Sequence, residues 1–307
     1  MIYHLSILLI SFIALHYSCA KVIDVSKDIG AIIDIPHWLI AVFMLSFGTS
    51  LPEAVVTIAS SIKGYPILAM GNLIGSNIAN VSLALGLPWL VYGLKSYTFQ
   101  KLFIFEFFAI QLLFVIVALY LNFNLVTGVL LILLYIAFIL FKVRQHRNGN
   151  GDRNTSVNST NKMSLAIKSL IAFTLIPLAS HFLVQSASEL INILGLSATF
   201  MGLVLLAVGT SLPEVYTCFM AIKKGLPEVA IGNVVGSNIV NSTFVAGFIG
   251  LFGVKTVSYS EFIYDFIIMM VFALLTSYIL LARFRSRFFS ILLLTGYIAY
   301  ITSLTLS

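Results

Sequence analysis

The sequence predicts an all-α polytopic membrane protein with ten transmembrane helices, arranged as two inverted five-helix repeats. Hydrophobic residues make up 60% of the 307 residues, charged residues only 9%, and the mean hydropathy is +1.07. A soluble fold of this size cannot bury so much apolar surface. The apolar runs are continuous over about 20 residues, which is the length of a membrane helix and not of a barrel strand. The third observation is that the same motifs occur twice along the chain.

The apolar runs define the ten expected helices, which are separated by short segments rich in polar residues, glycine or proline. These helices are expected at 2–20, 37–62, 66–93, 99–121, 124–143, 165–192, 197–222, 227–252, 258–282 and 287–305. No Lys or Arg precedes the first apolar run. That run is therefore predicted to be a retained membrane helix rather than a cleaved signal peptide.

One long polar segment divides the chain into two domains. Residues 145–163 are rich in Asn, Gly, Ser and Thr, which is typical of a flexible linker. The linker separates a first repeat at 1–144 from a second at 164–307. Within the repeats, the stretches 44–86 and 205–247 carry the same motifs at a constant offset of 161 residues. An ungapped offset over this length indicates an internal duplication.

The number of helices in each repeat and the distribution of positive charge predict the topology. Because five is odd, the second repeat must begin on the opposite side of the membrane from the first, as in many secondary transporters. With the N-terminus outside, all Lys and Arg residues except Lys63 and Lys255 lie on the cytoplasmic side. Cytoplasmic loops of membrane proteins carry such an excess. We therefore expect both termini outside the cell membrane and the linker in the cytoplasm.

The hexapeptide GTSLPE occurs at residues 48–53 and again at 209–214, both times inside an expected membrane helix. An ionised carboxylate at this depth costs at least about 2.5–3.5 kcal/mol. Glu53 and Glu214 therefore need a polar cavity, a bound proton or a bound cation. Their occurrence at equivalent positions of two repeats argues against a merely structural role.

The other residues of the hexapeptide suit a cation site. Its proline lacks a backbone N–H and its glycine loosens the helix, so together they are expected to break the helix and free carbonyl oxygens. The hydroxyl residues three and four positions before each glutamate share its helix face. Carboxylate, hydroxyl and carbonyl oxygens are the ligands of a hard cation such as Ca²⁺, Na⁺ or Mg²⁺. The hydroxyl candidates are Thr49, Ser50, Thr210 and Ser211.

A second motif reads GNLIGSNIAN at 71–80 and GNVVGSNIVN at 232–241. Its two glycines, four residues apart, predict close packing of this helix against a neighbour. A Ser and an Asn on each copy are also four residues apart and share a face. Buried hydroxyls and amides can simply bridge helices, but beside paired glutamates we expect them to add oxygen ligands. These candidates are Ser76, Asn80, Ser237 and Asn241.

Other acidic residues fit a cation site less well. Glu106 and Asp265 lie near the starts of expected helices, where an acid is more often an interfacial or dipole partner. The five histidines show no metal-ligand spacing, and the chain has no Walker A, GxSxG or HExxH motif. The sequence therefore predicts neither an enzyme nor a cofactor.

At the two repeated motifs the chain resembles the calcium/cation antiporter superfamily, in particular the sodium/calcium exchangers of the prokaryotic type. The resemblance covers both repeats, the ten-helix plan and the cytoplasmic linker. It implies alternating access, in which helices two, three, seven and eight form the ion-binding core while helices one and six slide across it. It also implies that Glu53 and Glu214 are shared ligands of one Ca²⁺ or several Na⁺. The remaining implied oxygen ligands are Thr49, Ser50, Thr210, Ser211, Ser76 and Ser237.

The chain departs from some members of that family at one position. They carry an aspartate where this chain has Asn241, and here both repeats end their second motif in asparagine. The expected site thus contains two carboxylates, whose two negative charges balance one Ca²⁺.

The sequence predicts a secondary antiporter that exchanges Ca²⁺ for Na⁺. The same fold with H⁺ or K⁺ as the coupling ion, or with another divalent cation as substrate, is the nearest alternative. A cation channel is less favoured, because inverted repeats with broken helices are typical of transporters. The expected partners are the ions and the lipid bilayer, with no nucleic acid and no obligatory protein partner.

Overall fold

The computed structural model describes residues 37–62, 66–95, 97, 100–148, 207–252 and 262–306, together with isolated residues within 3–28 and 166–189. Its regular elements in this part of the chain are helices. Six of them are long and apolar enough to cross a membrane, or seven if a bent pair counts as one span. The chain is thus a multi-pass helical membrane protein. The expected helices 2–20 and 165–192 lie largely outside the described residues, so the count of ten stays a prediction.

From residue 37 on, the described part of the first repeat consists of a broken helix followed by three longer spans. Five of its elements are π-helical or only four residues long, which marks places where the regular backbone pattern is interrupted. In chain order the elements are α2 (His37–Ile40), η1 (Ala41–Leu45), α3 (Ser46–Thr49), α4 (Leu51–Ile62), α5 (Pro66–Ala79), η2 (Asn80–Ala84), α6 (Leu85–Tyr92), α7 (Lys101–Ile116), η3 (Val117–Leu121) and α8 (Leu125–Asn148).

The described part of the second repeat reproduces this order of elements from α3 onward, except that it has no counterpart of η3. The elements are α11 (Ala207–Thr210), α12 (Leu212–Lys223), α13 (Pro227–Val240), η5 (Asn241–Val245), α14 (Ala246–Phe252), α15 (Ile263–Leu281) and α16 (Arg287–Leu306). The bounds of α11, α12, α13 and η5 are those of α3, α4, α5 and η2 shifted by the same 161 residues as the motifs. The sequence duplication is therefore also a duplication of secondary structure.

Most helix boundaries agree with the prediction to within a few residues, and α8 is the main correction. The sequence predicted its end at residue 143, but the helix continues through Asn148, so residues 145–148 of the expected linker are helical. No glycine or proline interrupts the chain there, and a glycine follows directly at position 149, where helices commonly end.

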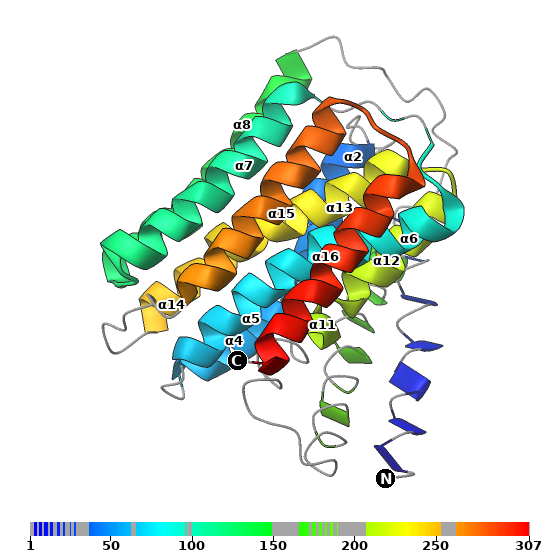
Figure 1. Cartoon of the computed structure of the whole chain (residues 1–307). Coiled ribbons are helices and arrows are strands. Elements are labelled where there is room, and N and C mark those ends of the chain that lie inside the picture. The colour runs from blue at the N-terminus through cyan, green and yellow to red at the C-terminus, as the bar shows by residue number, and fades with distance from the viewer. Residues whose placement is uncertain are drawn as a thin grey trace.

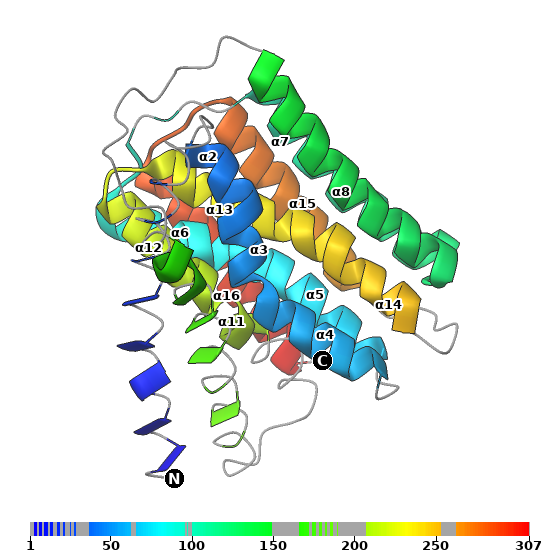
Figure 2. The same ribbon diagram turned by 180° about the vertical axis from the view of Figure 1, so that it is seen from behind.

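The two spans that carry the second motif form the interior of the bundle. The spans Ala69–Tyr92 and Pro227–Phe252 are 78% and 83% buried, against 22–50% for the spans of α7, α8, α15 and α16. Figures 1 and 2 show α5 and α13 between the outer helices when the bundle is seen from the front and from behind. Contacts between the repeats build this interior, because α3 packs on α13 and α11 packs on α5.

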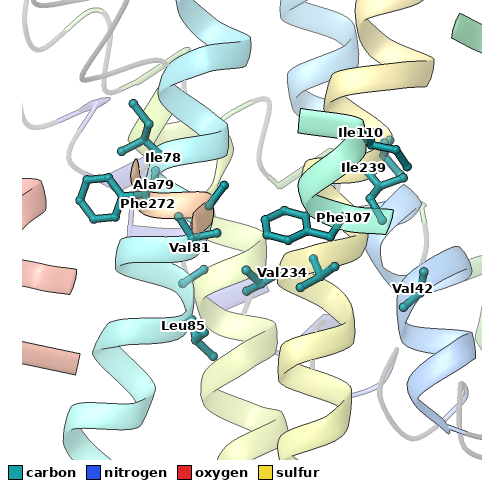
Figure 3. Packing of buried hydrophobic residues seen from close by; sticks show 14 of the residues in the cluster. Val42, Ile78, Ala79, Val81, Leu85, Phe107, Ile110, Val234, Ile239 and Phe272 are labelled. Carbon is teal, nitrogen blue, oxygen red and sulfur yellow. The ribbon is translucent and has the colours of Figure 1, made fainter. Parts of the chain in front are cut away.

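Apolar side chains surround these two central helices. Figure 3 shows Val81, Phe107, Val234 and Phe272 among the buried residues that come from η2, α7, α13 and α15. Because lipid tails are as apolar as these side chains, close packing rather than the exclusion of water holds membrane helices together. A Cβ atom on Gly236 would lie only 2.7 Å from Ser46 Oγ and from the Val42 carbonyl oxygen.

Several basic residues gather at one end of the bundle. Trp89 Nε1 donates to the Arg285 carbonyl at 3.3 Å, and Arg287 Nη2 donates to the Val91 carbonyl at 3.4 Å. Tyr97 joins the same region through its hydroxyl, which donates to the Phe284 carbonyl at 3.3 Å. The loops after α6 and α15 therefore meet, in the upper part of Figure 1. This clustering agrees with the predicted charge asymmetry, while the side of the membrane that it faces stays a prediction.

Candidate ion-binding site

Both GTSLPE hexapeptides interrupt a helix inside the bundle. α3 ends just before Ser50, whose φ and ψ are −83° and 5°, and the helix turns by 49° at this break. In the second repeat α11 ends just before Ser211, with φ and ψ of −82° and 1°. The helix break that the glycine and proline predicted is therefore present in both copies.

The break places each glutamate at the start of a new helix. Pro52 and Pro213 are the second residues of α4 and α12, where a missing N–H costs no helical hydrogen bond. Glu53 and Glu214 follow in the first turn. Negative charge is favoured there by the free N–H groups and the helix dipole. The local sequence thus supports two carboxylates within an apolar bundle.

The two glutamates are hydrogen-bonded across the repeats. Both side chains are 0% exposed. Ser211 Oγ donates to Glu53 Oε1 at 3.3 Å, and Ser50 Oγ donates to Glu214 Oε1 at 3.2 Å. The sequence placed each serine on the same helix face as the glutamate of its own hexapeptide. In the fold it instead contacts the glutamate of the other one.

The second oxygen of each carboxylate is left free. Among the described residues, neither Glu53 Oε2 nor Glu214 Oε2 has a hydrogen-bond partner. A buried carboxylate oxygen without a donor is costly. A bound cation removes this cost, because it supplies the missing positive charge to both oxygens.

Neutral hydroxyl oxygens lie beside the carboxylates and add to the candidate ligands of a cation. Thr49 Oγ1 lies 3.4 Å from Ser237 Oγ, and the equivalent pair, Thr210 Oγ1 and Ser76 Oγ, lies 3.2 Å apart. Ser237 Oγ also donates to Glu214 Oε1 at 3.0 Å. The tertiary structure therefore brings the predicted hydroxyls of both motifs into contact with one another and with a glutamate.

Asn80 and Asn241 begin the π-helical turns η2 and η5. Turns of this kind are frequent at functional sites. Asn80 Nδ2 donates to Asn238 Oδ1 at 3.0 Å, and Asn80 Oδ1 has no partner among the described residues. For Asn241, neither amide atom has a partner in that part of the chain. Both side chains thus retain a free oxygen, as expected of candidate ligands.

Sequence reasoning missed the first asparagine of each second motif. Thr49 Oγ1 donates to Asn233 Oδ1 at 3.4 Å, and Thr210 Oγ1 donates to Asn72 Oδ1 at 3.5 Å. Asn72 Nδ2 in turn donates to the Glu53 carbonyl at 3.4 Å. These asparagines therefore position the hydroxyl groups of Thr49 and Thr210 beside the glutamates. Their repetition at the 161-residue offset was the signal that could have identified them.

The two weaker acidic candidates are paired away from this site. Glu106 Oε2 forms an ion pair with Lys142 Nζ at 2.5 Å, and Asp265 Oδ1 accepts a hydrogen bond from Tyr300 at 2.7 Å. The described residues contain no group of three or more His, Cys, Asp or Glu that could hold a metal. The candidate site is therefore two carboxylates surrounded by hydroxyl and amide oxygens, a set that suits a hard cation.

Comparison with known proteins places this arrangement in a family. The family model described as sodium/calcium exchanger protein matches residues 3–144 and 164–306, which leaves out only the linker and the extreme ends. The chain belongs to the sodium/calcium exchanger family. Its two matched segments correspond to the two repeats.

Relatives from bacteria and archaea align with most of this exchanger-family chain. The inner membrane protein YrbG of Escherichia coli (strain K12) is 29% identical over 316 residues, covering 97% of this chain and 96% of that protein. The sodium/calcium exchanger MaX1 of Methanosarcina acetivorans is 28% identical over 271 residues, covering 74% and 76%.

A solved structure has the same fold. The sodium-calcium exchanger NCX_Mj, soaked with 2.5 mM Na⁺ and 0.1 mM Ca²⁺, superposes with a TM-score of 0.83 at 25% identity and covers 99% of both chains. The match shows that this chain and that exchanger share one fold.

Proposed function

We propose that this member of the sodium/calcium exchanger family exchanges Ca²⁺ for Na⁺ across the cell membrane by alternating access. The observation that carries the proposal is the pair of fully buried glutamates, Glu53 and Glu214, each with one carboxylate oxygen free. Their repeat-equivalent positions give one central site that both halves of the molecule contribute to. No covalent chemistry is involved, so the protein acts as a transporter and not as an enzyme.

The charge of the site suits either ion in turn. Two carboxylates balance the charge of one Ca²⁺, or of two Na⁺, so the two ions compete for one set of oxygens. In this proposal the ligands around the glutamates are Thr49, Ser50, Ser76, Asn80, Thr210, Ser211, Ser237 and Asn241. Exchange follows when the site opens to one side of the membrane at a time, which the expected helices 2–20 and 165–192 would bring about by sliding.

H⁺ is the nearest alternative to Na⁺ as the coupling ion. A buried glutamate that releases a cation can take up a proton instead, so H⁺ coupling needs no additional motif. K⁺ coupling and another divalent substrate are further variants of the same site, because its oxygen ligands suit hard cations in general.

Uptake into proteoliposomes tests the function. Vesicles containing the protein are loaded with Na⁺, and ⁴⁵Ca²⁺ uptake is measured with and without an outward Na⁺ gradient at fixed pH. We expect uptake only with the gradient. Uptake that does not depend on Na⁺ but follows an imposed pH or K⁺ gradient would show that H⁺ or K⁺ is the coupling ion instead. Uptake that needs no counter-ion at all would favour a channel.

Charge removal tests the site itself. Glu53→Gln and Glu214→Gln each remove one of the two charges while keeping the side-chain shape. Removing one partner of a buried charge interaction costs about 3–5 kcal/mol, so each change is expected to weaken Ca²⁺ binding by more than about 100-fold. Titration of the purified variants with Ca²⁺ measures this. A double variant that still transported Ca²⁺ normally would refute the assignment.

A further inference from the structure

The two halves of the site differ in the buried hydrogen bonds of their asparagines. Asn80 of the first repeat is bonded to Asn238 of the second at 3.0 Å. The 161-residue offset maps this pair onto Asn241 and Asn77. That equivalent bond is not formed, because Asn77 Oδ1 and both amide atoms of Asn241 have no partner among the described residues.

The amide of Asn77 is bonded in another direction. Its Nδ2 donates to Ser242 Oγ at 2.9 Å and contacts Met269 Sδ at 3.7 Å. Ser242 Oγ donates in turn to Gln111 Oε1. The side chains of Asn77, Ser242 and Gln111 are all 0% exposed. A buried chain of hydrogen bonds therefore runs from α7 through η5 to α5 and holds the Asn77 amide.

The residues that form these hydrogen bonds are polar in one repeat only. The offset places Val81 opposite Ser242, and an alignment of Glu106 with Asp265 places Met270 opposite Gln111. The hydroxyl and the amide that divert Asn77 thus have apolar counterparts on the Asn238 side. There Asn238 Nδ2 donates to the Asn77 carbonyl at 2.9 Å, and Asn238 Oδ1 accepts the hydrogen bond from Asn80.

We propose that Gln111 and Ser242 are positioning residues that hold the Asn77 amide away from Asn241 and so keep the Asn241 amide free for the transported cation. This inference rests on the proposed function. It gives the two asparagines different roles. The hydrogen bond to Asn238 fixes the orientation of the Asn80 amide and of its free oxygen. The Asn241 amide can instead rotate and turn its oxygen toward a bound cation.

A free Asn241 amide and one bonded to Asn77 would differ in their affinity for the cation. The difference is the free energy of the hydrogen bond that must be broken before the cation can bind. An intramolecular bond contributes about 0.5–1.5 kcal/mol net, which corresponds to an affinity change of up to about tenfold. If Asn77 paired with Asn241, the cation would have to compete with that bond. With Asn77 diverted to Ser242, no such competition exists.

The test makes the second half of the site resemble the first. Ser242→Val combined with Gln111→Met copies the residues at the equivalent positions. We expect Ca²⁺ to bind about tenfold more weakly, measured as a higher KM with kcat changed less than about twofold. Adding Asn77→Ala should then restore the affinity, because it removes the amide that captures Asn241. A purely structural defect would be made worse by the third change.

Two readouts separate this inference from the proposed function. Transport gives KM and kcat, while the structure of the Ser242→Val/Gln111→Met variant shows directly whether Asn77 has turned to Asn241, whatever the coupling ion is. Absence of Na⁺-driven uptake by the wild type would count against the function and leave the structural readout intact. The inference would be overturned if Asn77 kept its orientation in the double variant or if the KM for Ca²⁺ stayed unchanged. It would also be overturned if adding Asn77→Ala did not lower the KM of the double variant.

Discussion

At the scale of single residues, each buried glutamate depends on a serine from the other half of the chain. Ser50 reaches Glu214 and Ser211 reaches Glu53, over sequence separations of 164 and 158 residues. Hydrogen bonds to charged groups contribute about 1.5–3 kcal/mol, twice the value for neutral pairs. These two contacts link the repeats at the point where the ion is expected to bind.

This crossing predicts a specific pattern of coupling. Ser50→Ala and Glu214→Gln are expected to be non-additive by about 0.5–3 kcal/mol, because one change removes the hydrogen bond that the other weakens by removing its charge. Ser50→Ala and Glu53→Gln should be close to additive, although these residues are near neighbours in sequence. Unfolding of the variants in detergent, without divalent ions, measures both cycles. Coupling of Ser50 to Glu53 instead would contradict the observed geometry.

At the scale of the elements, close contact between helices of different repeats positions the site. Gly236 of α13 faces Ser46 and the Val42 carbonyl, where even a methyl group would come within 2.7 Å of both. Ser46 also hydrogen-bonds the Val42 carbonyl. The backbone of α13 can therefore approach η1 and α3 only because position 236 has no side chain.

Gly236→Ala is expected to push α13 away from the first repeat. Overpacking of this kind typically costs about 1–3 kcal/mol, and here it also separates Ser237 from Thr49. We expect lower thermal stability and strongly reduced Ca²⁺ binding. The matched control is Gly86→Ala, where a Cβ would meet the flexible Leu294 side chain at 3.2 Å. An equal loss in both variants would show that the backbone contact at Gly236 is not special.

The ion pair between α7 and α8 gives a second prediction for the elements. Lys142 is almost fully buried, pairs with Glu106 and lies 5.7 Å from the Phe103 ring centroid. Glu106→Gln leaves the ammonium without its counter-charge, which typically costs about 3–5 kcal/mol. The apparent melting temperature in detergent should fall clearly. Adding Lys142→Met should recover most of the loss, and failure to recover would argue that the pair is not the cause.

At the scale of the whole molecule, the distribution of basic residues sets the expected orientation. The loops after α6 and α15 meet at one end of the bundle and carry Lys95, Arg283 and Arg285. In the predicted topology this end faces the cytoplasm, since positive residues are retained on that side. The C-terminal end of α16 lies at the other end of the bundle in Figure 1.

Reporter fusions test this orientation. Green fluorescent protein fused after residue 307 should stay dark, because it does not fold when exported, whereas alkaline phosphatase at the same point should be active. The same reporters inserted in the linker, at residue 155, should give the opposite pattern. Fluorescence from the C-terminal fusion would reverse the predicted topology.

The sequence by itself determined the helical membrane class, the duplication and the two motifs. These depend on local properties: apolar length, the glycine and proline in GTSLPE, and spacing along one helix. The structure keeps Glu53 and Glu214 at equivalent breaks, as the motifs predicted. It also corrects the end of α8, where the helix runs beyond its apolar part because nothing in the sequence stops it before Gly149.

Only the tertiary structure decided which residues meet. The serine of one hexapeptide reaches the glutamate of the other, Asn72 and Asn233 hold the threonines, and Asn77 turns to Ser242 and Gln111 instead of Asn241. The physical reason is that these contacts join segments far apart in the chain, and their geometry is set by how α3 packs on α13 and α11 on α5. A repeat predicts equal partners for both halves. Ser242 and Gln111, which have apolar counterparts in the other repeat, make the two asparagines of the site unequal.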